Sequence, residues 1–101
     1  MAFGLFLAIS PFAKAQNLIL NGNFSSGTNN FTSDYVYVTG ANSANPEGTY
    51  SVVTKANDVH SAWGGYFDHT SGNSSGKYFI ANASSDTTKT VWQSNLLNVA
   101  Q

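Results

Sequence analysis

The sequence predicts an all-β fold built as an antiparallel β-sandwich, and two patterns support this class. Ser, Thr, Asn and Gly together fill more than two fifths of the 101 positions, and they separate short runs of β-branched and aromatic residues. Apolar residues do not recur at helical spacing over three turns. Because 42% of the residues are hydrophobic and 14% are aromatic, the chain carries enough apolar side chains for a core, which argues against intrinsic disorder.

Charge and cysteine content exclude several classes of protein. The chain has four Lys, no Arg and a formal net charge of -1 at pH 7, so it lacks the basic surface that nucleic-acid backbones require. The absence of Cys excludes a disulfide scaffold and a thiolate zinc site. A length of 101 residues limits the chain to one domain or part of one. We therefore expect a single unit without a nucleic-acid partner.

Residues 1–15 predict a signal peptide. This apolar stretch ends in Ala13-Lys14-Ala15, whose two Ala residues provide the small side chains that signal peptidase requires. Cleavage is therefore expected before Gln16. No basic residue precedes the stretch, which leaves open an upstream start, a short buried helix or an uncleaved anchor. The stretch is shorter than the ~20 residues of a spanning helix. We expect residues 16–101 to be secreted or displayed at the cell surface, with no membrane span after cleavage.

Turn residues dominate the start of the exported region. Residues 17–20 are a brief apolar run, which ends at Asn21–Gly22, a pair suited to the positive φ angles of a tight turn. Phe24 and Phe31 then flank residues 25–30, all of which have turn composition. This pattern is typical of short strands separated by polar turns.

Four later segments predict strands because they are rich in β-branched or aromatic residues and are bounded by polar turns. They are residues 35–38, 49–54, 77–82 and 89–94, with a loop at residues 40–48. Alternation along the second segment places Tyr50 and Val52 on one face. It places Ser51 and Val53 on the opposite face.

The predicted strands are too few to close a β-sandwich. The sequence predicts five or six strands, whereas sandwiches of about 100 residues have seven or more. Residues 16–101 would therefore leave an apolar sheet face uncovered and an edge open to pairing with another chain. We expect this region to be the N-terminal part of a longer β-sandwich domain, incomplete at its C-terminus, or to complete its fold by association.

Three motifs resemble those of galactose-binding-like jelly-roll domains, which occur in carbohydrate-binding modules and in bacterial exported proteins with PEP-CTERM or surface-sorting tails. The motifs are N-L-I-L-N-G-N-F at residues 17–24, D-H-T-S-G at residues 68–72 with G-K-Y-F-I-A-N at residues 76–82, and T-V-W-Q-S at residues 90–94. The resemblance implies an antiparallel jelly roll, and it implies that about the last third of that fold would follow Gln101.

The same resemblance bears on a structural calcium site. The family opening usually places Glu after the Phe, where it can serve calcium, whereas Phe24 is followed here by Ser25. Calcium prefers several oxygen ligands, above all carboxylates together with backbone carbonyls. Asp68 and Thr70, with the carbonyls of residues 72–76, remain as calcium candidates, and no other cofactor is expected.

A loop cluster supplies the candidate ligand contacts. Both His residues, two Asp and one Trp lie within residues 57–70, on what should be one long connection between strands. Sugar recognition combines a flat aromatic ring with polar groups that bind hydroxyls. We expect carbohydrate contacts from Trp63, Tyr66, Asp68 and His69. In the alternative interpretation, Trp63, Tyr66 and Phe67 are core residues under the loop, and Asp68 caps a turn.

No arrangement of residues predicts catalysis. Residues 72–76 match G-x-S-x-G, but a nucleophile elbow requires a following helix, and residues 77–80 predict a strand. No pattern pairs the carboxylates across a cleft, as glycoside hydrolysis would require. His60 and His69 alone are too few ligands for zinc. We therefore expect a non-enzymatic chain.

These patterns together predict a non-catalytic secreted or cell-surface domain that binds a glycan or another component of the cell surface or matrix. One alternative is a structural or adhesive module that mediates protein–protein contact and has no sugar site. Another is an accessory domain to an enzyme encoded further along a longer chain.

Overall fold

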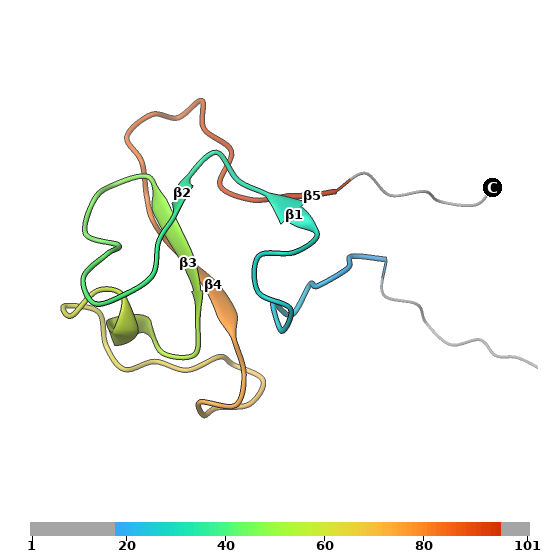
Figure 1. Ribbon diagram of the computed structural model, residues 1–101, viewed down its shortest axis with the longest axis vertical. Helices are drawn as coiled ribbons and strands as arrows, with labels where there is room; N and C mark the ends of the chain where they lie inside the picture. Colours follow the sequence, from blue (N-terminus) through green and yellow to red (C-terminus); the bar gives the residue numbers. More distant parts are fainter. Residues whose placement is uncertain (1–17, 96–101) are drawn as a thin grey trace, which may run out of the picture.

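The computed structural model describes residues 18–95, so the predicted signal peptide at residues 1–15 lies outside the described residues. The described part forms five short strands and one 3-10 helix: β1 (Phe31–Thr32), β2 (Val36–Tyr37), β3 (Thr49–Val53), η2 (Ala56–Asp58), β4 (Tyr78–Asn82) and β5 (Gln93–Ser94). One sheet contains β1 and β5, and the other has the order β2-β3-β4 (Figure 1). The prediction of a small β fold with little helix is confirmed.

Strand β3 lies in the middle of the larger sheet. It pairs with β4 in antiparallel orientation, with Thr49 opposite Asn82 at one end. It pairs with β2 in parallel orientation, with Val36 opposite Thr49. The prediction of purely antiparallel sheets is therefore wrong for β2 and β3. The loop at residues 38–48 returns the chain to the end of the sheet where β2 begins, so that β3 runs in the same direction. Parallel strands need such a long connection, because a tight hairpin can join only antiparallel strands.

Two hydrophobic cores pack against the alternating side chains of the larger sheet. The first core contains Phe31, Tyr35 and Tyr50, packed against Phe24, Val52, Phe79, Ala81 and Trp92. The second core contains Ala44, Val53 and Val59, packed against Val38, Trp63, Tyr78 and Ile80. Tyr50 and Val52 thus belong to one core and Val53 to the other, which confirms the predicted alternation along β3.

Aromatic rings join the two sheets within the first core. The Phe31 ring of β1 meets the Tyr50 ring of β3 edge-on, with ring centroids 6.0 Å apart. It also meets the Phe79 ring of β4 at 5.9 Å. The Trp92 ring, just before β5, lies 6.3 Å from the Phe31 ring. Ring packing therefore holds the two-residue strands β1 and β5 against the larger sheet.

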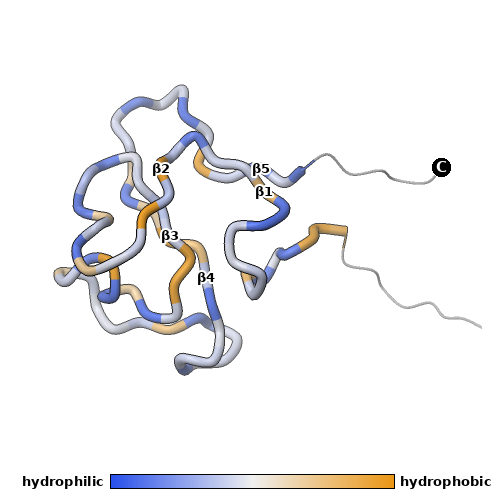
Figure 2. The backbone as a smooth tube through the Cα atoms, viewed as in Figure 1, coloured by the Kyte–Doolittle hydropathy of each residue, from blue (hydrophilic) through white to orange (hydrophobic). Residues whose placement is uncertain are grey.

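The apolar run at residues 18–20 forms no strand in the structure. It precedes a series of turns, and its Leu18 and Leu20 side chains are exposed. In Figure 2 this run has the colour of hydrophobic residues and lies next to the grey N-terminal trace. The side-chain amide of Asn21 donates hydrogen bonds to the carbonyls of Gly27 and Asn29, each at 2.8 Å. Such side-chain bonds to the backbone compete with strand pairing, which explains the turns.

Strands β2 and β5 are shorter than predicted for a related reason. The backbone N–H of Tyr35 donates to the hydroxyl of Ser33 at 3.0 Å. The backbone N–H of Asp34 donates to the carbonyl of Thr90 at 2.9 Å, and the N–H of Thr90 donates to the Asp34 carboxylate at 2.8 Å. These bonds occupy backbone groups that a longer ladder would need.

Candidate functional site

The connection between β3 and β4 spans residues 54–77, and the carbonyl of Tyr66 ties its middle to η2 and to β4. The Tyr78 hydroxyl donates to this carbonyl at 2.6 Å, and the backbone N–H of Ala56 donates to it at 3.2 Å. The Tyr66 ring itself is 72% exposed. It lies over Gly64, where a Cβ would collide with the ring. The second half of the connection is therefore fixed beside the start of β4.

Asp68 organises the next turn of this connection. One carboxylate oxygen accepts hydrogen bonds from the backbone N–H groups of Thr70 and Ser71, at 3.0 and 2.9 Å. The other oxygen accepts from the Ser71 hydroxyl. These donors stabilise the ionised form, so the hydroxyl of Ser71 and then its backbone N–H hold the pKa of Asp68 below the usual value. Gly76 approaches so closely that a Cβ there would collide with this carboxylate.

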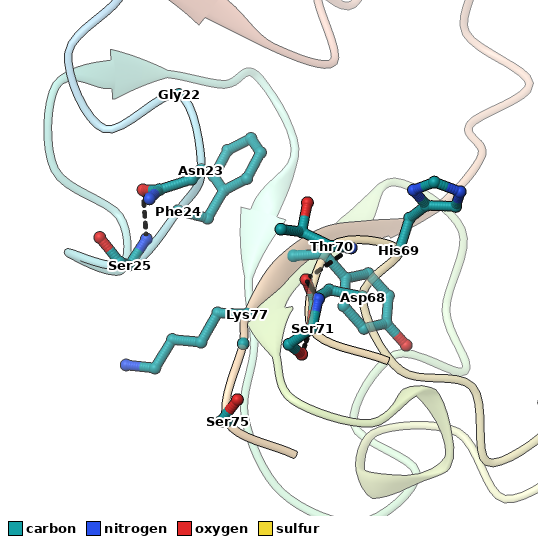
Figure 3. A pocket seen from close by; sticks show the side chains of 12 residues that line it. Gly22, Asn23, Phe24, Ser25, Asp68, His69, Thr70, Ser71, Ser75 and Lys77 are labelled. Atoms are coloured by element: carbon teal, nitrogen blue, oxygen red, sulfur yellow. Dashed lines mark hydrogen bonds between the residues drawn. The ribbon is translucent and has the colours of Figure 1, made fainter. Parts of the chain in front are cut away.

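A pocket of about 460 Å³ lies between this turn and the N-terminal segment (Figure 3). Residues 22–25 line one side, and residues 68–71 with residues 75–78 line the other. The Phe24 ring packs on the Phe79 ring of β4 at 5.7 Å, which brings the two sides together. The volume falls within the range of about 300 to 1,000 Å³ that is typical of small-molecule sites.

The structure separates the four predicted carbohydrate contacts into two groups. Asp68 and His69 line the pocket, although Figure 3 shows the His69 ring pointing away from the N-terminal segment. Trp63 and Tyr66 are not among the lining residues. Trp63 is half-buried against the second core and stacks on the His60 ring at 4.4 Å with an interplanar angle of 11°. The packing of Trp63 and the turn at Asp68 are features that the alternative interpretation expects. That interpretation also places Tyr66 and Phe67 in the core, whereas both side chains are exposed.

Sequence reasoning did not single out the other polar residues of the pocket. Asn23 and Ser25 come from the N-terminal turns, and Ser75 and Lys77 come from the end of the connection. Figure 3 shows the Lys77 side chain extending from the start of β4 toward the N-terminal segment. The sequence signal for these residues is that both segments lie in or next to the motifs that resemble galactose-binding-like domains. The spacing of the two motifs along the chain does not reveal that they face each other in the fold.

The pocket combines one carboxylate, one ammonium group and several neutral donors. Asp68 is the only acidic residue among the lining residues, and Lys77 is the only Lys. The side-chain nitrogen of Asn23 and the hydroxyls of Ser25, Thr70 and Ser75 have no hydrogen bond to any other residue in the described range. Phe24 and Tyr78 add aromatic surface. This set of groups is suited to a small ligand rich in oxygen.

The predicted calcium ligands do not fit a calcium ion. Among residues 18–95, no three His, Cys, Asp or Glu side chains lie close enough together to hold a metal. The Asp68 carboxylate already accepts bonds from Thr70 and Ser71, and no second carboxylate lines the pocket. Calcium takes six to eight oxygen ligands, usually with more than one carboxylate. The oxygens of Asp68 and Thr70 fall short of that set.

The G-x-S-x-G match at residues 72–76 has no nucleophile-elbow geometry. A strand follows this segment, as the sequence predicts, although β4 begins at Tyr78, one residue after the predicted start. The helix that a nucleophile elbow requires is therefore replaced by a strand. The Ser75 backbone N–H donates to the Asn73 side-chain oxygen at 2.8 Å, which makes the segment a polar turn. Ser75 and Gly76 of this segment line the pocket.

In the described part of the chain, no helix is long and apolar enough to cross a membrane. The resemblance to galactose-binding-like domains stays a prediction, because comparisons with known protein families, with curated proteins and with solved structures return no match for the chain.

Proposed function

We propose that the chain is a non-catalytic, exported domain of galactose-binding-like jelly-roll type, which binds glycan in the pocket between residues 22–25 and 68–78. The observation that carries this proposal is the composition of the pocket. The amide nitrogen of Asn23 and the hydroxyls of Ser25, Thr70 and Ser75, which have no hydrogen bond within residues 18–95, can bind sugar hydroxyls, and the aromatic residues provide apolar surface for the C–H face of a sugar ring. Asp68 and His69, two of the predicted contacts, lie in this lining.

The connection to β4 supports such a role because it combines rigidity with accessible groups. Tyr66 and Asp68 fix its backbone through hydrogen bonds, and the ring of Tyr66 stays exposed two residues before the pocket wall. Loops held by a rigid sheet are common places for binding groups. A fixed wall lowers the entropy cost of ordering the site when a ligand binds.

Affinity electrophoresis of the full chain in gels with a panel of neutral and acidic polysaccharides tests this proposal. We expect retardation by at least one polysaccharide. Ser75→Leu places an apolar side chain in the pocket wall and should abolish the retardation, whereas Ser85→Leu, an exposed position outside the pocket, should leave it unchanged. No retardation by any polysaccharide would contradict glycan binding.

A structural or adhesive module is the second candidate, and one observation favours it. Large apolar side chains are exposed on the outer strand β2, where Val36 is 61% and Tyr37 is 47% exposed, and on the run at residues 18–20. Exposed apolar groups on an edge strand can pair with another chain. Analytical ultracentrifugation of the full chain tests this candidate. Self-association that Val36→Lys abolishes would support it, and a monomer at all concentrations would contradict contact between copies.

A further inference from the structure

Lys77 is the one ammonium group in the pocket lining, and it has no partner in the described part of the chain. No hydrogen bond or ion pair links it to any residue between positions 18 and 95. Figure 3 shows its side chain extending away from the sheet, toward the N-terminal segment that carries Asn23 and Ser25. Its positive charge is therefore available to a ligand.

The carboxylate that lines the pocket together with Lys77 is bound by other groups. Asp68 accepts two backbone N–H groups and the Ser71 hydroxyl, and these donors stabilise its ionised form. The remaining acidic residues of the described chain do not line the pocket. Two of them are bound elsewhere, since Asp34 accepts from the N–H of Thr90 and Asp86 accepts from Thr88. No acidic residue between positions 18 and 95 forms an ion pair with the Lys77 ammonium group.

The neutral groups around Lys77 also favour an acceptor-rich ligand. The side-chain nitrogen of Asn23 can only donate, and the hydroxyls of Ser25 and Ser75 can donate as well. Donors beside an ammonium group bind a carboxylate or sulfate better than they bind a neutral hydroxyl, because charge-assisted hydrogen bonds are about twice as strong as neutral ones.

From this geometry we propose that the pocket selects glycans with an anionic substituent, a carboxylate or a sulfate, which pairs with Lys77 while ring hydroxyls bind Asn23, Ser25 and Ser75. This inference rests on the proposed function, because it names the class of sugar that the same pocket takes. The preference should weaken with added salt, since the ammonium group lies at the protein surface and its attraction is screened.

Titration calorimetry of the full chain with paired ligands separates charge from ring structure. The first pair is an oligogalacturonide and its methyl ester, and the second is a sulfated galactan oligomer and the unsulfated oligomer. We expect the charged member of at least one pair to bind with a Kd about two- to fivefold lower, the range for an exposed charge pair. The pair that shows the preference identifies carboxylate or sulfate as the group recognised.

Matched variants assign this preference to Lys77. Lys77→Met keeps the apolar stem and should remove the preference, whereas Lys77→Arg should keep it. Lys89→Met changes the net charge equally at an exposed position outside the pocket and should have no effect. Equal loss in Lys77→Met and Lys89→Met, or equal binding of charged and neutral members, would overturn the inference and leave glycan binding intact. Absence of binding to all four ligands would instead overturn the proposed function.

Discussion

The ring of Tyr50 stacks on the ring of Phe79, with centroids 5.0 Å apart and an interplanar angle of 14°. This pair joins the central strand β3 to β4, and Phe79 also contacts Phe24 and Phe31. A single side chain therefore connects both sheets and the N-terminal segment that forms one wall of the pocket. The pocket depends on the first core for its shape.

Phe79→Ala should destabilise the chain by about 2 to 3 kcal/mol, because it removes three ring contacts and opens a cavity in a partly buried core. Urea unfolding followed by tryptophan fluorescence measures this change. Val36→Ala on the exposed strand β2 is the control and should change stability by less than about 0.5 kcal/mol. Equal effects of both substitutions would contradict the assignment of the first core.

Asp68 should titrate below its ordinary pKa of 3.8, and Ser71→Ala should raise that pKa, because the Ser71 hydroxyl is the largest cause of the lowering. The ionised carboxylate is favoured in the folded chain, so its contribution to stability is present above the unfolded pKa. It is lost as the pH falls through the lower folded pKa. NMR titration of the side-chain carboxyl carbons measures both values. An Asp68 pKa that Ser71→Ala leaves unchanged would contradict the hydrogen-bond pattern.

Gly76→Ala should distort the turn at Asp68, because the new Cβ would collide with the Asp68 carboxylate. We expect a loss of about 1 to 3 kcal/mol of stability, together with weaker glycan binding, since the change displaces one pocket wall. Gly65→Ala in the same connection is the matched control, because a Cβ there meets its nearest atoms at 3.7 Å, an ordinary contact. Thermal unfolding of both variants gives the comparison, and a fully stable Gly76→Ala variant would show that the turn is not tightly packed.

Trp63→Ala should reduce stability by about 2 kcal/mol and leave glycan retention by the folded chain unchanged. The indole is half-buried against the second core and stacks on His60, and it does not line the pocket. Thermal unfolding and affinity electrophoresis of the same variant separate the two effects. Lost retention in a variant that stays folded would place Trp63 in the site, as the sequence predicts.

Parts of the fold that depend on local pattern could be predicted from the sequence. The alternation of Tyr50 and Val53 gave the two faces of β3, and the aromatic and β-branched residues before Asn82 gave β4. The parallel pairing of β2 could not be predicted, since the same residues fit either orientation and the loop at residues 38–48 decides between them.

The candidate site, too, could be predicted from the sequence only in part. The long connection and the turn at Asp68 follow from local composition, and the turn was one of the two interpretations of that residue. The opposite wall at Asn23 and Ser25 comes from a segment far away in sequence, which packs there through the rings of Phe24 and Phe79. Such contacts depend on tertiary packing, which no local pattern contains.

The most direct test of the central claim, glycan binding in this pocket, is an NMR titration of the isotope-labelled full chain with the polysaccharide that retards it most strongly. We predict that backbone amide signals of residues 22–25 and 68–78 shift, while those of the exposed strand β2 stay in place. Shifts confined to β2 and residues 18–20, or no shifts at saturating glycan, would contradict the claim.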